Sequence, residues 1–394
     1  MLISVVYLPV SMGLFKKKTR SAVLVDIGSA SVGGAYVHIA EGKAPQLCYT
    51  ARIPVVRHEQ ESITASMLRA LDQLVLMLVS EGGPALYREV SNAHIDMIVA
   101  SVAAPWQETT VHTVSLQEKY PFTFTRLLMQ RAVTTKTPPP GRIVSDTSVI
   151  ATTLNGYATE NPWGKRVTRA DLTVLTSTIE KLVVHDITKT LQSAFHSHHV
   201  EITAFAPVSF AVIADLYPHQ QDFIVIDVSG TATDALIVKK GIIAGVRSIP
   251  HGIHDLLSAA RVAARSAPGA DIIVPERNAA FAPKVESIEI AWLSDLKQVL
   301  SEFAKHTPLP RAVFLLADDD AREFLKRLID NSSLRTLWLS GDSLSIITFA
   351  PEHTANAVTT RGLAEGDVFL SMLALFYRER LMSCLLYTSD AADE

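Results

Sequence analysis

The chain has 394 residues, of which 48% are hydrophobic and 19% charged, and its formal net charge at pH 7 is −4. This composition is typical of a globular protein long enough for two domains, and it excludes a disordered chain. The negative charge gives no reason to expect nucleic-acid binding. Two cysteines, Cys48 and Cys384, cannot form a disulfide framework or a thiolate metal site, so we expect a reducing compartment.

The two ends of the chain differ from the part between them. Residues 2–10 form a short apolar run that precedes the basic residues instead of following them, the reverse of a secretory signal. We therefore interpret 1–20 as a tail and expect translation to start at Met12. The last residues, CLLYTSDAADE (384–394), resemble the translation of a sequencing adapter, and the alternative is an ordinary acidic tail.

Two segments far apart in the chain follow the same plan. Each has an apolar strand that reaches an Asp, a turn of glycine and hydroxyl residues, and a second strand. The segments are 22–35 and 222–252, and their acids are Asp26 and Asp227. The shared pattern predicts one module used twice.

The other expected elements follow in chain order. The first module continues with a strand at 46–55, a helix at 62–78 that Gly82-Gly83-Pro84 end, and a strand at 96–103. An inserted unit follows, with strands at 109–114, 142–157 and 170–177 and helices at 124–132 and 179–197. A strand at 200–205 and a helix at 208–216 then lead into the second module. After it we expect helices at 253–265, 288–304, 321–330 and 369–378, strands at 310–316, 334–339 and 344–349, and a polar loop at 266–282.

These elements divide the chain into two domains with an insertion. The first domain covers 21–108 and 200–219, the inserted α+β subdomain covers 109–199, and the second domain covers 220–383. Turns of small residues after Asp-containing strands are suited to phosphate, because backbone N–H groups can face the anion and the Asp can hold hydrated Mg²⁺. The alternative at either turn is an Asp that only caps it.

Several motifs carry a family resemblance. They are MGLFKKK (12–18), VDIGSASVGG (25–34), NGYATENPWGK (155–165), VIDVSGTATD (225–234) and IPHG (249–252). With these motifs in this order, the chain resembles the actin/Hsp70/sugar-kinase superfamily, and within it the bacterial FtsA and PilM group with its inserted SHS2-like subdomain. The resemblance implies an α/β, two-domain actin-like (ribonuclease H-like) ATPase fold that clasps ATP and Mg²⁺ between its domains.

The resemblance also implies which residues would contact the nucleotide. From the first domain these are Asp26, Gly28, Ser29 and Ser31, and from the second they are Asp227, Ser229, Gly230, Thr231, Thr233 and Gly252. Asp26 and Asp227 would hold Mg²⁺ through water.

The chain departs from the pattern of the family in three places. Gly33 stands where PilM-like proteins often carry a Lys, and Ser229 stands where Gly is usual. Ala317-Asp318 replaces the Gly-Gly of the adenosine-contacting motif, so that a Cβ atom would crowd the ribose and a carboxylate would repel phosphate. These departures favour weak or absent ATP hydrolysis.

The implied function is that of a cytoplasmic scaffold or adaptor at the inner face of the membrane, regulated by ATP. It would act in type IV pilus assembly (PilM-like) or cell division (FtsA-like), with membrane-linked pilus or division proteins as partners and with possible self-association. The sequence does not decide whether the protein is an enzyme. The alternatives are an active Mg²⁺-dependent ATPase or kinase of the Hsp70/sugar-kinase kind, and a homologue that binds no nucleotide.

Three charged clusters have plain interpretations. His196, His198 and His199 are expected at a solvated helix end and not in a metal site. The acids at 318–320 favour the start of the next helix. The basic residues at 16–20 are interpreted as a solubilising tail, with contact to anionic lipid as the alternative.

Overall fold

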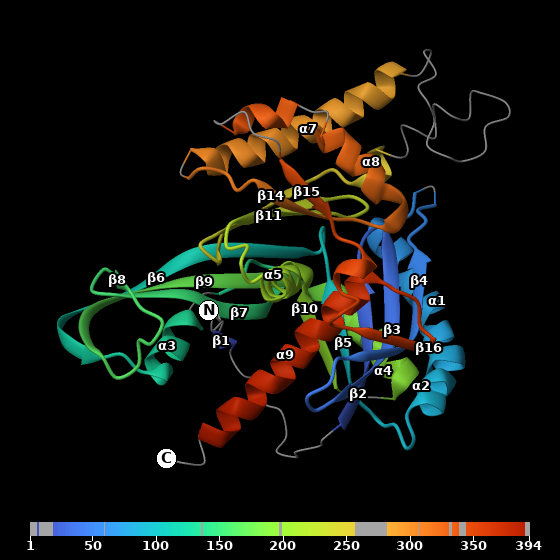
Figure 1. Ribbon diagram of the computed structural model, residues 1–394, viewed down its shortest axis with the longest axis horizontal. Coiled ribbons are helices and arrows are strands. Elements are labelled where there is room, and N and C mark those ends of the chain that lie inside the picture. The colour runs from blue at the N-terminus through green and yellow to red at the C-terminus, as the bar shows by residue number, and fades with distance from the viewer. Residues whose placement is uncertain are drawn as a thin grey trace.

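The computed structural model describes residues 6–7, 19–58, 60–134, 137–196, 199–256, 282–305, 307–330, 333–338 and 344–390. The described strands form three sheets, two of which belong to the paired modules and one to the inserted unit (Figure 1). Nearly all of the loop expected at 266–282, and most of the helix expected at 253–265, lie outside the described residues.

The first sheet has the strand order β10-β5-β2-β3-β4-β16. Its strands are β2 (Thr19–Ile27), β3 (Ser31–Ala40), β4 (Gln46–Pro54), β5 (Ile95–Val102), β10 (Val200–Ala204) and β16 (Thr359–Leu363). β2, β3 and β4 form the expected antiparallel meander, and β5 pairs with β2 in parallel. Most side chains of β2 and β3 are buried because both faces of the sheet are covered.

The helix after β4 does not end where the sequence predicts. α1 (Ile63–Met77) runs into a π-helical turn, η1 (Leu78–Gly82), and then into α2 (Gly83–Glu89). Gly82 packs so closely on the first sheet that a Cβ atom there would lie 2.5 Å from Tyr36. Pro84 falls in the first turn of α2, where a missing N–H costs little. The prediction that Gly82-Gly83-Pro84 end the helix was therefore wrong.

This long helix, Ile63–Glu89, is apolar enough to cross a membrane by length and composition alone. Its inward-facing residues are nevertheless part of the core under the first sheet, where Met67, Leu71 and Leu74 are buried. The burial of this stripe is what an amphipathic covering helix of a globular domain requires.

The second sheet repeats the plan of the first. Its order is β13-β12-β11-β14-β15. The strands are β11 (Phe223–Val228), β12 (Thr233–Lys239), β13 (Ile242–Ile249), β14 (Ala312–Leu316) and β15 (Ser345–Thr348). An antiparallel meander is again flanked by a strand parallel to its first member, so the prediction of one module used twice is confirmed.

The helices of the second domain pack on its sheet. Among the described residues, these contacts are made by α7 (Ala282–Ala304) and α8 (Asp319–Asp330). The segment expected as a strand at 334–339 is instead a 3₁₀ helix over its described part, η2 (Ser333–Leu337). Leu334 and Trp338 anchor it in the core, and the indole of Trp338 donates a hydrogen bond to the carbonyl of Pro310 at 2.9 Å. These local anchors override the strand propensity of the segment.

The inserted unit forms its own antiparallel sheet, β1-β7-β9-β6, and extends to the left in Figure 1. Its elements are β1 (Val6–Tyr7), β6 (Gln107–Thr123), α3 (Arg126–Val133), β7 (Arg142–Leu154), β8 (Tyr157–Ala158) and β9 (Arg166–Glu180). The next helix, α4 (Lys181–Phe195), lies inside the range expected for the insertion but packs its buried side chains, Val183, Ile187 and Leu191, into the core of the first domain.

Two helices lie between the domains. α5 (Phe205–Leu216) and α9 (Val368–Asp390) share one hydrophobic core with residues of both sheets, such as Leu24 on β2 and Phe314 on β14. α9 extends beyond the expected helix at 369–378. This shared core holds the ends of β2, β11 and β14 against each other, and that junction is where the predicted site residues meet.

Candidate functional site

The two predicted acids face one small cavity between the domains. Asp26 on β2 is 4% exposed and Asp227 on β11 is 8% exposed. The cavity has a volume of about 20 Å³. Of the predicted residues, its lining includes the following five: Asp26, Gly28, Ser31, Asp227 and Ser229. It has room for about one water molecule.

The turns that were expected to hold phosphate are hydrogen-bonded to each other. The backbone N–H of Ser29 donates to Oγ of Ser229 at 3.0 Å, and the two hydroxyl oxygens lie 2.8 Å apart. The backbone N–H of Thr231 donates to Oγ of Ser29 at 3.0 Å. A Cβ atom at Gly230 would lie 2.3 Å from the carbonyl oxygen of Ser29. Groups predicted to face an anion thus face the opposite turn.

Two other residues that were predicted to contact the nucleotide, Thr233 and Gly252, support the second turn through contacts with neighbouring segments. Oγ1 of Thr233 donates to the carbonyl of His251 at 2.8 Å and accepts from the indole N–H of Trp292 at 3.0 Å. A Cβ atom at Gly252 would lie 2.4 Å from the carbonyl oxygen of Ser229. Glycine is therefore needed at 252 so that the chain after β13 can pass close to the turn.

Arg52 is the main site residue that the sequence analysis missed. It lies on β4 directly opposite Gly33 on β3. A Cβ atom at Gly33 would lie 2.5 Å from Nη2 of Arg52, so the absence of a side chain at 33 makes room for the guanidinium. The resemblance implies a Lys at position 33. Here the cation comes instead from Arg52 on the neighbouring strand.

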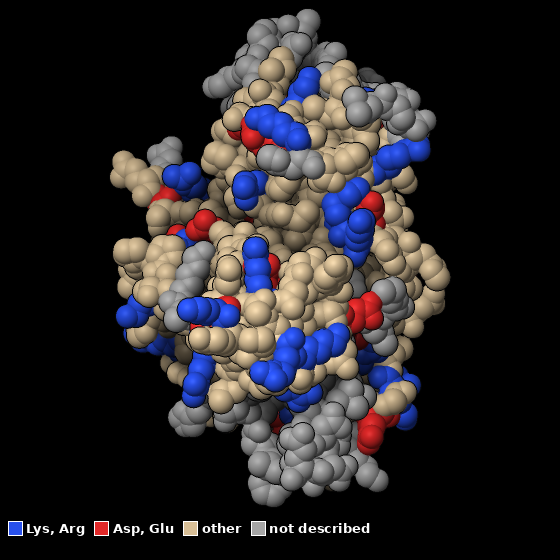
Figure 2. Space-filling model, turned by 90° about the vertical axis from the view of Figure 1, so that its left-hand side faces the viewer, with Lys and Arg blue, Asp and Glu red and all other residues tan. Residues whose placement is uncertain are grey.

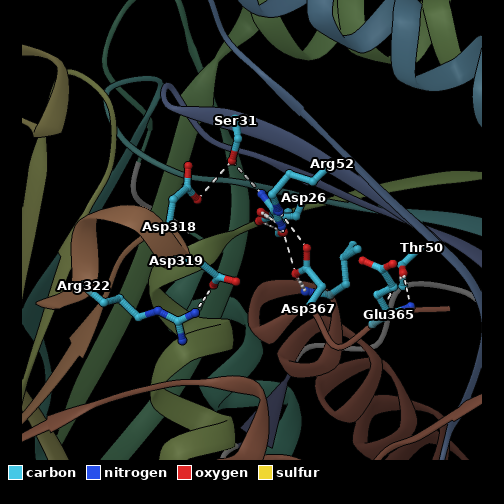
Figure 3. Close-up of polar contacts among 11 residues, drawn as sticks. Asp26, Ser31, Thr50, Arg52, Asp318, Asp319, Arg322, Glu365 and Asp367 are labelled. Atoms are coloured by element: carbon cyan, nitrogen blue, oxygen red, sulfur yellow. Dashed lines mark hydrogen bonds and ion pairs between the residues drawn. The ribbon is translucent and has the colours of Figure 1, made fainter. Parts of the chain in front are cut away.

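The guanidinium of Arg52 joins three segments of the chain (Figure 3). Its Nε and Nη2 atoms contact the two carboxylate oxygens of Asp367 at 2.7 and 3.0 Å. Nη2 also lies 3.1 Å from Oδ2 of Asp26, and Nη1 donates to Oγ of Ser31 at 2.8 Å. Because Asp367 caps the first turn of α9, accepting from the N–H of Leu370 at 3.0 Å, Arg52 ties that helix to the cavity.

The third wall of the cavity is the end of β14, where the sequence predicted crowding. Ala317 is fully buried, and Asp318 lines the cavity. Oγ of Ser31 donates to Oδ1 of Asp318 at 3.1 Å, which links the first domain to the second. α8 begins at Asp319, in agreement with the prediction that the acids at 318–320 start a helix, and Asp319 forms an ion pair with Arg322.

Burial dominates the electrostatics of the cavity. It raises the pKa of Asp26 to about 6, although the charge of Arg52 opposes the shift. Burial, together with the nearby carboxylates of Asp234, Asp26 and Asp318, holds the pKa of Asp227 well above its usual range. Burial opposes the charge of Arg52 as well, but Asp367 and Asp26 outweigh it and raise the pKa of Arg52. The cation is therefore permanent, and the carboxyl of Asp227 is the one that favours protonation.

A nucleotide does not fit this arrangement. The cavity of about 20 Å³ is far below the roughly 300 Å³ or more of a small-molecule site. The carboxylate of Asp26 is already engaged by Arg52 and by the hydroxyl of Ser101, which donates to it at 3.0 Å. Among the described residues, no group of three or more His, Cys, Asp and Glu side chains is placed to hold a metal ion. Binding of ATP and Mg²⁺ by this chain stays a prediction, and it requires the two turns to separate.

Comparison with known proteins gives similarity at the level of structure. No protein-family model matches the chain, and no curated protein matches its sequence. A solved structure described as the PilM-PilN type IV pilus biogenesis complex is similar over 91% of this chain and 98% of that chain, with a TM-score of 0.56 and 16% identity.

Two further solved structures match with lower scores. A Bacteroides thetaiotaomicron protein described as having an actin-like ATPase fold and unknown function covers 92% of this chain and 99% of its own, with a TM-score of 0.38 and 9% identity. The ethanolamine utilization protein EutJ from Carboxydothermus hydrogenoformans covers 90% of this chain and 89% of its own, with a TM-score of 0.40 and 13% identity. With its repeated sheets and interdomain core, the chain has the two-domain actin-like ATPase fold that the sequence predicts.

Proposed function

We propose that this protein is an adaptor of type IV pilus assembly that uses the actin-like fold without a nucleotide. Its own side chains hold the two domains together at the place where the family clasps ATP. It would act in the cytoplasm, at the inner face of the membrane, and connect cytoplasmic components to a membrane-linked pilus protein.

The observation that carries this proposal is the network around Arg52. A guanidinium supplies the positive charge that Mg²⁺ would supply among the acids, and it contacts both Asp26 and Asp367. The direct contact between Ser29 and Ser229 closes the phosphate turns on each other. A domain pair closed in this way presents one fixed surface to a partner, which suits a scaffold better than a catalyst with a ligand-driven cycle.

The pilus role rests on the similarity to the PilM-PilN complex, which extends over almost the whole length of both chains. That structure contains a PilM bound to a PilN, and we extend the idea of a membrane-linked partner to this chain. Cell division, the FtsA-like role, stays the alternative assignment for an adaptor with this inserted subdomain.

An active ATPase is the second candidate function. The observation in its favour is that Asp26 and Asp227 meet in one cavity at the ends of equivalent strands. For turnover, the hydrogen bonds between Ser29 and Ser229 would have to break and the guanidinium of Arg52 would have to leave the cavity. The adaptor proposal requires neither step.

Deletion and complementation in the host separate these functions. We expect the deletion strain to lose surface pili and to divide normally, and we expect Asp227→Asn to restore pili as well as the natural chain. Asn keeps the size of the side chain but cannot hold Mg²⁺ as a carboxylate does, so an ATPase would be inactivated. Filamentous cells would favour the division role, and failure of Asp227→Asn at a normal protein level would contradict nucleotide independence.

A further inference from the structure

The inserted subdomain carries an excess of basic side chains at the end far from the cavity. β6 starts beside the second domain, where the Gln107 side chain donates to Asp234, so the other ends of β6 and β9 point outward. We call the segments 115–131 and 153–171 the distal end. They contain six Lys and Arg against three Asp and Glu, a net charge of +3, whereas the whole chain carries −4. Figure 2 looks onto this side of the molecule, where Lys and Arg outnumber the acids.

Three apolar side chains project from the distal end. Tyr120 is 74% exposed, Leu127 is 56% exposed and Tyr157 is 80% exposed. Tyr120 lies in a bulge, because the pairing of β6 with β9 jumps between Gln117 and Phe122. Leu127 lies in the first turn of α3, and Tyr157 follows the tight turn at 155–156, where both residues have positive φ. Each tip therefore lies at a bulge, a turn or a helix start of the distal end.

Cationic side chains lie beside two of these tips, and others are exposed on the same distal end. Nζ of Lys119 lies 5.8 Å from the ring centre of Tyr120. The guanidinium of Arg126, next to Leu127, lies 5.5 Å from the ring centre of Trp163. Lys165 and Arg166 are exposed at the start of β9. Exposed Tyr and Leu surrounded by Lys and Arg is the composition of protein surfaces that enter the headgroup layer of a membrane.

We propose that the distal end docks on a bilayer surface that contains anionic lipids. Tyr120, Leu127 and Tyr157 enter the headgroup layer, and the surrounding Lys and Arg side chains attract the lipid phosphates. This contact requires the three tips to touch the flat bilayer surface at the same time. The contact would hold the adaptor at the membrane independently of any protein partner.

The edge of β6 argues against an added peptide strand as the occupant. β6 is an edge strand of its sheet, and such strands can accept another strand. The bulge at 118–121 interrupts the ladder, and it contains Lys119 and Pro121, which are residues that block pairing at an exposed edge. A bilayer needs no continuous row of backbone groups, so it suits this surface better.

Vesicle co-sedimentation of the full chain tests the proposal. We expect binding to vesicles of phosphatidylcholine with phosphatidylglycerol, weakening with added salt, and no binding to phosphatidylcholine alone. The double reversal Lys165→Glu/Arg166→Glu should lower the apparent affinity at least about 100-fold, because attraction becomes repulsion at two positions. The matched control Lys43→Glu/Lys189→Glu changes the net charge equally at exposed positions elsewhere and should stay within a few-fold of the natural chain.

The aromatic tips have their own variant and control. Tyr120→Ser/Tyr157→Ser should weaken vesicle binding about tenfold, whereas Tyr87→Ser, which removes an exposed Tyr from α2, should not. Absence of binding by the natural chain, or equal losses in the control variants, would overturn the proposal. If the charge reversal abolished capture of an acidic protein segment and left vesicle binding unchanged, the surface would belong to a protein partner and the proposal would also be overturned.

Discussion

The cavity between the domains and the distal end of the inserted subdomain use charge in opposite ways. In the cavity, Arg52 is shared between the buried Asp26 and the partly buried Asp367, and these charges are paired with one another. At the distal end, Lys165 and Arg166 are exposed. Buried charges must be paired within the chain because desolvation is costly, whereas exposed charges are available to a partner. On the proposed function, the cavity is a structural joint between the domains and recognition takes place at the surface.

The largest expected effect is at the joint itself. Arg52→Ala should lower the free energy of unfolding by about 3–5 kcal/mol, because it leaves the buried carboxylate of Asp26 and the partly buried carboxylate of Asp367 without their cation. Arg166→Ala at the distal end should change it by less than about 0.5 kcal/mol. Urea denaturation of the two variants at pH 7 measures the contrast, and equal effects would remove the distinction between the two regions.

A smaller effect is expected from filling the space beside Arg52. Gly33→Lys should cost about 1–3 kcal/mol in the natural chain, because its Cβ atom alone would lie 2.5 Å from Nη2 of Arg52. In an Arg52→Ala background the same change should cost less than about 1 kcal/mol, since the new ammonium group takes over part of the missing charge. Additive costs in this double-mutant cycle would show that Gly33 and Arg52 do not depend on each other.

The smallest of the three effects concerns pH. Because the pKa of Asp227 is raised in the folded protein, the folded state binds its proton more tightly than the unfolded state does. The contribution of this group to stability is therefore greatest below its ordinary pKa and is lost as the pH rises. Asp227→Asn removes that loss and should raise the free energy of unfolding at pH 8 by on the order of 1 kcal/mol, with little effect at pH 4.

The distal end supplies a control of opposite sign for the pH effect. The hydroxyl of Ser115 and the charge of Arg169 lower the pKa of Asp171, so its contribution is present at neutral pH and is lost as the pH falls. Asp171→Asn should therefore destabilise slightly at pH 8 and have no effect in acid. Urea midpoints from pH 4 to 8 check both variants, and slopes of the same sign would contradict the assignment.

The sequence predicted what is encoded locally. The strands before Asp26 and Asp227, the turns after them and the repetition of the module all follow from short apolar runs and small residues. The exposed polar edge strand β16 was missed because it has no apolar alternation. The helix end at Gly82 was predicted wrongly because close packing on Tyr36 outweighs a local stop signal.

The role of Arg52 was beyond local reasoning for a different reason. Its partner Asp367 is 315 positions away in the chain, and nothing near either residue indicates the other. The only available signal was Gly33, which departs from the family pattern on the adjacent strand. The absence of a side chain at Gly33 showed that the Lys implied by the resemblance is missing. It could not identify Arg52 as the residue that supplies the cation.

Calorimetric titration of the natural chain with MgATP tests the central claim most directly. If Arg52 and the contact between Ser29 and Ser229 take the place of a nucleotide, no saturable heat should appear up to about 1 mM, a ligand concentration at which even sites worth only about 4 kcal/mol are half filled. Saturable binding of one MgATP per chain, weakened by Asp227→Asn, would contradict the account and favour an ATPase cycle.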